Sequence, residues 1–246
     1  MMNIPDILIV VTSNSEVGGK ETGLWLEEFM APYMIFRKDG YGITVTSPKG
    51  GEVPLDQRSI EGAQKLREQS QQSVGASAAT QPKGEEFLFQ EGMEVLKNTQ
   101  KLSDVDPQEY QVVYFPGGHG TMGDLPTREV AEVVRHFMEN DKIVAAVCHG
   151  PAAFVEAKGS GGESLIKGRK LTSFTNAEEE EVGMKNDVPF LLESRLRELG
   201  AHFQGASNWS DNVVADGKLI TGQNPQSAES LAMAVTKALH QEEVTA

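Results

Sequence analysis

Cys148 is the only cysteine of the 246-residue chain, and it stands directly before His149 at the end of a short apolar run, 143–147. Such a run is typical of a buried strand. Gly150-Pro151 and an alanine-rich segment follow, so the pattern predicts a strand, a sharp turn and a helix, the geometry of a nucleophile elbow. A helix N-terminus lowers the pKa of a thiol, which would activate it. A lone cysteine is just as often an inert core residue, so this stretch alone leaves both interpretations open.

A glycine-rich turn supplies a second candidate element. Pro116-Gly-Gly-His-Gly120 follows the strand predicted at 111–115. Backbone amides in such a turn can bind an anion or an oxyanion, although glycines also serve tight connections. Neither glycine motif of nucleotide-binding proteins, GxGxxG or GxxxxGK[ST], is present. His119 lies in this turn, and we expect it to stabilise the turn.

Carboxyl groups occur in two helical patterns. We expect a helix from Thr22, its N-cap, to about residue 34, in which Glu28 shares the apolar face of Leu24. A carboxylate there usually lies at the edge of the face and reaches water, whereas a buried one would have a raised pKa and could carry protons. Glu178–Glu181 are expected to form a solvated face or helix-start charge, with at most one functional member.

The elements that position these residues alternate between strands and helices. This alternation predicts a single α/β domain over residues 1–246 with a mostly parallel central sheet. Ligands of such sheets bind beyond the carboxyl ends of the strands. Both the Gly117-Gly118 turn and Cys148 fall at such ends, which favours a reactive cysteine. Residues from about 50 to 108 are predicted to form a cap or surface insertion rather than a separate domain, because their apolar content is thin. Within this segment we expect a helix near 59–70, a polar tip at 73–82 and a second helix from 85 to about 102.

Composition excludes several classes of function. The net charge of −14 opposes binding to a phosphate backbone, so no nucleic-acid partner is expected. No apolar run is long enough to span a bilayer and no signal peptide is visible, while a single cysteine suits a reducing compartment. We therefore expect a cytoplasmic protein. The histidines are scattered along the sequence, so we expect no metal site.

Several ordered motifs resemble the ThiJ/PfpI superfamily, a flavodoxin-like fold shared with class I glutamine amidotransferases. The motifs lie at 116–125, 145–151, 165–175 and 221–227. Residues 21–29 and 36–40 resemble the glyoxalase III and heat-shock chaperone branch of that superfamily. The similarity covers nearly the whole chain and is weakest from about residue 58 to residue 106.

The resemblance implies roles for the candidate residues. Cys148 would be the nucleophile and His149 its basic partner. An acid after Phe174-Thr175 would orient the histidine; spacing places it at Glu179, with its neighbours in the glutamate run as alternatives. Glu28 matches the helix-borne carboxyl that contacts the thiol. Amides at Gly117, Gly118 and His149 would form the oxyanion pocket.

The activity implied by the resemblance is a glyoxalase that needs neither cofactor nor metal. It would convert a small 2-oxoaldehyde such as methylglyoxal to a 2-hydroxy acid through a hemithioacetal on Cys148, a lyase of the D-lactate dehydratase type. A stress-related holdase chaperone and a protein deglycase are the alternatives, and a cysteine peptidase or amidase ranks lower. Superfamily members are often dimers, so a homodimer is a further expectation.

Overall fold

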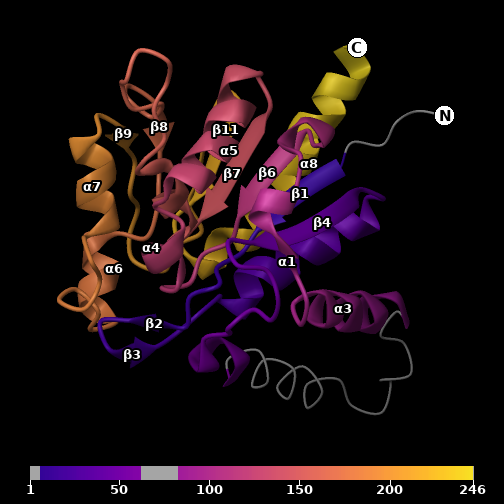
Figure 1. The fold of residues 1–246 in the computed structure, drawn as a ribbon, viewed down its shortest axis with the longest axis horizontal. Coiled ribbons are helices and arrows are strands. Elements are labelled where there is room, and N and C mark those ends of the chain that lie inside the picture. Colours follow the sequence, from indigo (N-terminus) through magenta and orange to yellow (C-terminus); the bar gives the residue numbers. More distant parts are fainter. Residues whose placement is uncertain (1–5, 62–82, 246) are drawn as a thin grey trace.

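The computed structural model describes residues 6–61 and 83–245, and a seven-stranded sheet with the order β10-β11-β7-β6-β1-β4-β5 forms its centre (Figure 1). All neighbouring strands pair in parallel except the edge pair β10 and β11, so the mostly parallel sheet is confirmed. The strands are β1 (Asp6–Val10), β4 (Gly42–Ser47), β5 (Gln100–Lys101), β6 (Val112–Phe115), β7 (Ile143–Val147), β10 (Val213–Asp216) and β11 (Leu219–Gly222).

Helices cover both faces of this sheet. Because side chains alternate along a strand, Ile7 and Ile9 of β1 face one hydrophobic core while Leu8 and Val10 face the other. The first core is completed by α1 (Leu26–Lys38), α3 (Lys83–Val95) and α8 (Ala228–Thr245). The second is completed by α4 (Thr121–Asp124), α5 (Arg128–Glu139), the 3₁₀ helix η3 (Gly150–Phe154) and α7 (Leu192–Glu198).

Smaller elements surround the sheet. The strands β2 (Glu16–Val17) and β3 (Lys20–Glu21) form a hairpin, and β8 (Lys170–Leu171) pairs with β9 (His202–Phe203). The remaining elements are η1 (Leu102–Asp104), η2 (Pro107–Glu109), α6 (Asn176–Glu181) and η4 (Pro225–Ser227). No helix of the described ranges has the length and apolarity needed to cross a membrane.

Helix α1, which carries Glu28, begins later than the sequence indicates. Leu24 pairs with Leu55 in an isolated bridge, so the backbone before Leu26 is extended rather than helical. Thr22 is therefore not the N-cap, and its hydroxyl instead donates to the Asp56 carboxylate at 2.8 Å. Ser59 accepts the Leu26 amide at 3.1 Å. The start of α1 is thus fixed by a segment more than 30 residues away in sequence.

The predicted insertion at 50–108 contributes to the central sheet. Helix α3 ends at Val95 instead of near residue 102, because the following residues form β5, which pairs Gln100 and Lys101 with β4. A helix was expected near 59–70, and residues 57–61 are helical. The rest of that helix and the polar tip expected at 73–82 fall within residues 62–82, outside the described residues. The cap therefore stays a prediction.

The contact between Ser59 and α1 generates a stability prediction. Ser59 is 3% exposed, and its hydroxyl accepts from the Leu26 amide while it donates to the Asp56 carbonyl. Ser59→Ala should lower the free energy of unfolding by about 1–2 kcal/mol, because it leaves the first helical amide unpaired. Urea unfolding followed by tryptophan fluorescence measures the change. Ser103→Ala, at an exposed serine, is the control, and equal effects of the two substitutions would contradict the prediction.

Candidate active site

Cys148 occupies a sharp corner at the end of β7, as the sequence predicts. Its φ is +59°, a left-handed conformation that costs a non-glycine residue about 1–3 kcal/mol unless its surroundings impose it. The surroundings do so here: its amide donates to the Gly222 carbonyl and its carbonyl accepts from the Phe174 amide, both at 2.9 Å. The element after the corner is not the expected α-helix but the five-residue 3₁₀ helix η3.

The thiol is buried, and its pKa differs from the sequence expectation. Burial, followed by the nearby Glu28 carboxyl, raises the pKa of Cys148 well above its ordinary value, while the Gly118 amide acts to lower it. The expected lowering by a helix N-terminus is wrong, because a short 3₁₀ helix does not offset complete desolvation. His149 Nδ1 lies 3.2 Å from Sγ. A thiolate therefore forms at this site when the histidine accepts the thiol proton.

Glu179 is the acid that contacts His149. Its Oε2 lies 2.7 Å from His149 Nε2, and only 2% of the residue is exposed. Burial acts to raise the pKa of Glu179, but the charge of His149 and hydrogen bonds from His119 and His149 hold it well below its usual range. The carboxylate is thus ionised beside the imidazole. Glu179 is thus the member of the glutamate run that contacts His149, and its role as the orienting acid stays a prediction.

The other glutamates of that run are not all solvated. Glu178 is fully buried, forms a capping box with Thr175, and accepts hydrogen bonds from the Trp209 amide, Gln223 and Asn224. A solvated face is therefore wrong for Glu178, which ties α6 to the loop around Trp209 and to the end of β11. Glu181 accepts from the Trp209 indole at 2.9 Å. Sequence patterns carry no signal for the contacts to Trp209, Gln223 and Asn224, because these partners lie 28 to 46 residues away.

Glu28 is a core residue and not an edge residue of α1. It is 0% exposed, and burial raises its pKa to about 8, so it is protonated at neutral pH. Its Oε2 accepts the Gly117 amide at 2.8 Å. Its Oε1 has no hydrogen-bond partner among the described residues, while the carboxyl and the Cys148 thiol interact closely enough to shift each other's pKa. The structure therefore brings the expected carboxyl to the thiol.

The expected oxyanion pocket keeps two of its three amides. The Gly117 amide binds Glu28, so it is not directed to substrate, which differs from the expectation. The Gly118 amide faces the sulfur, and the His149 amide donates to no acceptor among the described residues. Gly118 has a φ of +100°, and a Cβ there would lie 2.3 Å from the Gly23 carbonyl oxygen. Glycine at 118 therefore allows the turn to approach the chain before α1.

Cys148 and His149 line a cavity of about 170 Å³. Its apolar walls are Trp25, Phe174, Val182, Trp209 and Pro225. The rest of the lining consists of Arg58, Gly118, His119, Cys148 and His149. Trp209 has a φ of +62°, a strained conformation that Glu178 and Glu181 hold through its amide and indole. The sequence analysis missed both Arg58 and Trp209. The volume suits a small molecule.

His119 and His149 converge on Glu179 in space. The expectation that the scattered histidines share no site is therefore wrong for these two residues. The ligand atoms of all three residues lie within 4.8 Å of one another, and these residues are the set that could hold a metal ion among the described residues. Each imidazole Nε2 lies 2.6 or 2.7 Å from a Glu179 oxygen. Ligands at about 2.0–2.2 Å from a tetrahedral zinc stand farther apart than this. The arrangement fits two hydrogen bonds to Glu179 better than a metal ion.

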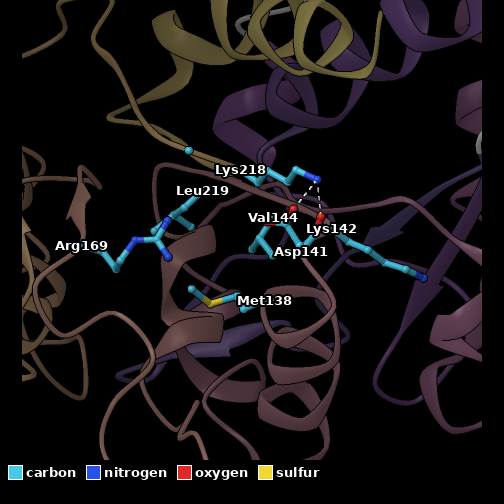
Figure 2. Close-up of a pocket in the computed structure, with 8 residues that line it drawn as sticks. Met138, Asp141, Lys142, Val144, Arg169, Lys218 and Leu219 are labelled. Atoms are coloured by element: carbon cyan, nitrogen blue, oxygen red, sulfur yellow. Dashed lines mark hydrogen bonds and ion pairs between the residues drawn. The ribbon is translucent and has the colours of Figure 1, made fainter. Parts of the chain in front are cut away.

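A second cavity, of about 300 Å³, lies beside the start of β7 and of β11, away from the thiol (Figure 2). Its cations already have partners. Arg169 binds Asp216 at 3.0 Å, Lys218 binds Asp141 at 3.0 Å, and the Lys142 ammonium donates to three backbone carbonyls. Its lining holds no cysteine and no histidine. The chemistry of the described residues is therefore concentrated at Cys148.

The raised pKa of Glu28 predicts a pH-dependent stability. Folded Glu28 holds its proton up to about pH 8, whereas the unfolded chain releases it near 4.5, so the free energy of unfolding falls as pH rises between these values. Glu28→Gln removes this dependence. Between pH 5 and pH 8 the free energy of unfolding of the variant should therefore fall less steeply with pH, by the slope that corresponds to nearly one proton released on unfolding. Urea unfolding at several pH values measures it. Glu129→Gln, at an exposed site, is the control; matching slopes for the two variants would refute the assignment.

Comparison with known proteins supports the same fold. Residues 22–238 match the DJ-1/PfpI family. Glyoxalase 3 of Candida albicans is 31% identical over 243 residues, which cover 90% of this chain and 93% of that protein. The crystal structure of glyoxalase III from Candida albicans matches with a TM-score of 0.77 and 30% identity, over 96% of this chain and 97% of that one. The protein/nucleic acid deglycase HchA of Escherichia coli is 30% identical over 154 residues, 58% of this chain and 53% of that protein. The chain belongs to the DJ-1/PfpI family.

Proposed function

We propose that this protein is a glutathione-independent glyoxalase that converts a small 2-oxoaldehyde, such as methylglyoxal, into a 2-hydroxy acid, D-lactate in that case. One observation carries the proposal. A single thiol contacts a histidine base at 3.2 Å and a carboxyl that is protonated at neutral pH, within a cavity of about 170 Å³. The similarity to Glyoxalase 3 over 90% of the chain supports it.

The first step joins the sulfur to the aldehyde carbon, C1. His149 Nδ1 takes the proton of Cys148, and the thiolate adds to C1 while the carbonyl electrons move to oxygen. The amides of Gly118 and His149 stabilise this oxyanion. Glu28 then donates its proton to the oxygen. The product of the step is a hemithioacetal, and Glu28 is left as a carboxylate.

The second step moves hydrogen between neighbouring carbons. The Glu28 carboxylate removes the proton from C1, the electrons form a C1–C2 double bond, and the C2 oxygen takes the proton of the His149 imidazolium. Glu28 then returns its proton to C2, and His149 removes the proton of the C1 hydroxyl. The result is a thioester of the 2-hydroxy acid. C1 is oxidised and C2 is reduced within one molecule, so no external oxidant or reductant takes part.

Hydrolysis ends the cycle. Water attacks the thioester carbon and loses a proton to the Glu28 carboxylate. The tetrahedral oxyanion collapses, the C1–S bond breaks, and the sulfur takes the proton of His149. The site returns to a protonated thiol, a neutral histidine and a protonated Glu28. A group with a pKa of about 8 is suited to gain and lose a proton near neutral pH in this way.

Other activities receive less support. A deglycase would use the same thiol, and HchA carries that name, but a cavity of about 170 Å³ favours a free aldehyde over a modified protein chain. The same volume disfavours a peptidase or amidase. A holdase chaperone needs a large exposed apolar patch. Among the described residues, the large exposed hydrophobic side chains are Phe87 and Met233, on different helices.

The proposal also includes a location and an assembly state. A reaction that begins from a reduced thiol suits a cytoplasmic enzyme, because that compartment keeps cysteines reduced. The resemblance to the superfamily supports a homodimer. Size-exclusion chromatography with light scattering measures the assembly, and a monomer at micromolar concentration would remove the dimer from the proposal.

The reaction predicts lactate formation from methylglyoxal by the purified protein without glutathione. Cys148→Ala should lower the rate by at least about a thousandfold, because it removes the group that forms the intermediate. Enzymatic determination of D-lactate measures the product. The proposal fails if wild type and Cys148→Ala turn over equally slowly. Suppression of aggregation that is retained by Cys148→Ala, without any wild-type lactate, would favour the chaperone instead.

The orienting acid gives a second prediction with a matched control. Glu179→Gln should lower kcat by roughly a hundredfold or more, because an amide does not stabilise the imidazolium of His149 and favours a different hydrogen-bond arrangement. Glu180→Gln, at the exposed neighbour, should leave kcat unchanged. Steady-state kinetics at pH 7 compare the two variants. Equal activity of both would contradict the role of Glu179.

A further inference from the structure

His119 contacts the proposed catalytic groups, yet the mechanism above does not use it. We propose that His119 is a positioning residue: its Nε2–H donates to Glu179 Oε1 and so keeps the carboxylate ionised and directed at His149. The inference rests on the proposed function and extends it by a fourth residue. No motif spacing indicated it, and the sequence analysis assigned the residue only to the turn.

The geometry supports this role. Glu179 offers one oxygen to each imidazole, with Oε1 2.6 Å from His119 Nε2 and Oε2 2.7 Å from His149 Nε2. An ionised carboxylate only accepts, so both nitrogens must carry hydrogen. A neutral His149 then has a bare Nδ1, and that is the atom 3.2 Å from the sulfur. The two bonds to one carboxylate therefore fix the tautomer that can accept the thiol proton.

His119 can donate without adding charge. It is 4% exposed, and its pKa falls to about 4, chiefly through burial and then through the neighbouring His149, with Arg58 acting in the same direction and Glu179 opposing. The two rings lie 4.1 Å apart between centroids. A positive charge on His119 would oppose protonation of His149. A neutral donor satisfies the buried oxygen and avoids that repulsion.

The glycine-rich turn does not depend on the His119 side chain. Thr121 Oγ1 lies 2.8 Å from the Gly118 carbonyl and 3.1 Å from the His149 carbonyl, which ties the turn to the elbow. The Gly120 amide donates to the Gly23 carbonyl at 3.2 Å. The backbone of the turn is thus fixed by its own contacts, and the imidazole is left to bind Glu179.

Removal of the imidazole should weaken the base. Without His119, Glu179 Oε1 is buried and unpaired, so the pKa of Glu179 rises and its carboxylate can turn away from His149. The imidazolium of His149 is then less stable, and the thiol loses its proton less readily. The bond from His119 acts through Glu179 on His149 Nε2, the ring nitrogen away from the sulfur, so kcat should fall more than KM changes.

The test compares His119→Leu with His119→Gln by two measurements. Leucine has no donor, whereas the glutamine amide can reach Oε1. His119→Leu should slow alkylation of Cys148 by iodoacetamide at pH 7 about tenfold, shift its pH profile upward, and lower kcat with KM within about twofold. His119→Gln should keep both rates within about threefold of wild type. Equal behaviour of the two variants, or a His119→Leu profile like that of wild type, would overturn the inference.

A measurement on the wild type keeps the inference testable if His119→Leu does not fold. Nitrogen-15 NMR of the imidazoles should show His119 neutral with hydrogen on Nε2 throughout pH 5.5 to 8; hydrogen on Nδ1, or a charged ring at pH 7, would overturn it. Alkylation does not require glyoxalase activity. A shifted alkylation profile in a protein that makes no lactate removes the proposed function alone, and unaffected alkylation in a protein that makes lactate removes this inference alone.

Discussion

A carboxyl group removed from water must receive hydrogen-bond donors from the chain or give up its charge, and the site depends on how this constraint is met. Burying an unpaired carboxylate costs several kcal/mol, far more than a single hydrogen bond contributes. Glu178 and Glu179 meet the constraint with donors from distant segments, and Asp56 does so with Thr22 and Arg58. Glu28 meets it by staying protonated. Each solution joins parts of the chain that sequence order separates.

The same constraint divides the chemical roles among residues of one type. Glu179 has its pKa lowered by two histidines, while Glu28, with a single amide donor and a thiol as neighbours, has its pKa raised by burial. One glutamate is therefore a fixed negative charge and the other a proton carrier, and environment alone separates them. The thiol belongs to the second group, because burial keeps it protonated at rest. In the proposed mechanism, the reactivity of the thiol comes from the histidine beside it and not from a lowered resting pKa.

Local patterns predicted the strands, the elbow and the positions of the nucleophile and its base, because buried strands and sharp turns depend on a few neighbouring residues. The resemblance to a known superfamily supplied Glu28 and Glu179. Local patterns failed for Glu178, His119 and Trp209, whose partners lie far along the chain. They also failed for the start of α1, where the bridge of Leu24 to Leu55 overrides a helical pattern. Tertiary contacts decided each of these cases, and periodicity does not report them.

The opposite pKa shifts set the pH range in which the whole site is assembled. The pKa of His119 is lowered, so its contribution to stability is lost as pH falls below 6.5. The pKa of Glu179 is also lowered, so its contribution is lost at lower pH, as pH falls through the ordinary range of a carboxyl. The raised pKa of Glu28 means that its contribution is lost as pH rises toward 8. A protonated Glu28, an ionised Glu179 and a neutral His119 coexist only between these limits. The Glu28 contribution already declines above about pH 4.5, and the His119 contribution declines only below about pH 6.5, so these shifts together favour the fold most in mildly acidic solution. At neutral pH Glu28 still holds the proton that the proposed first step requires.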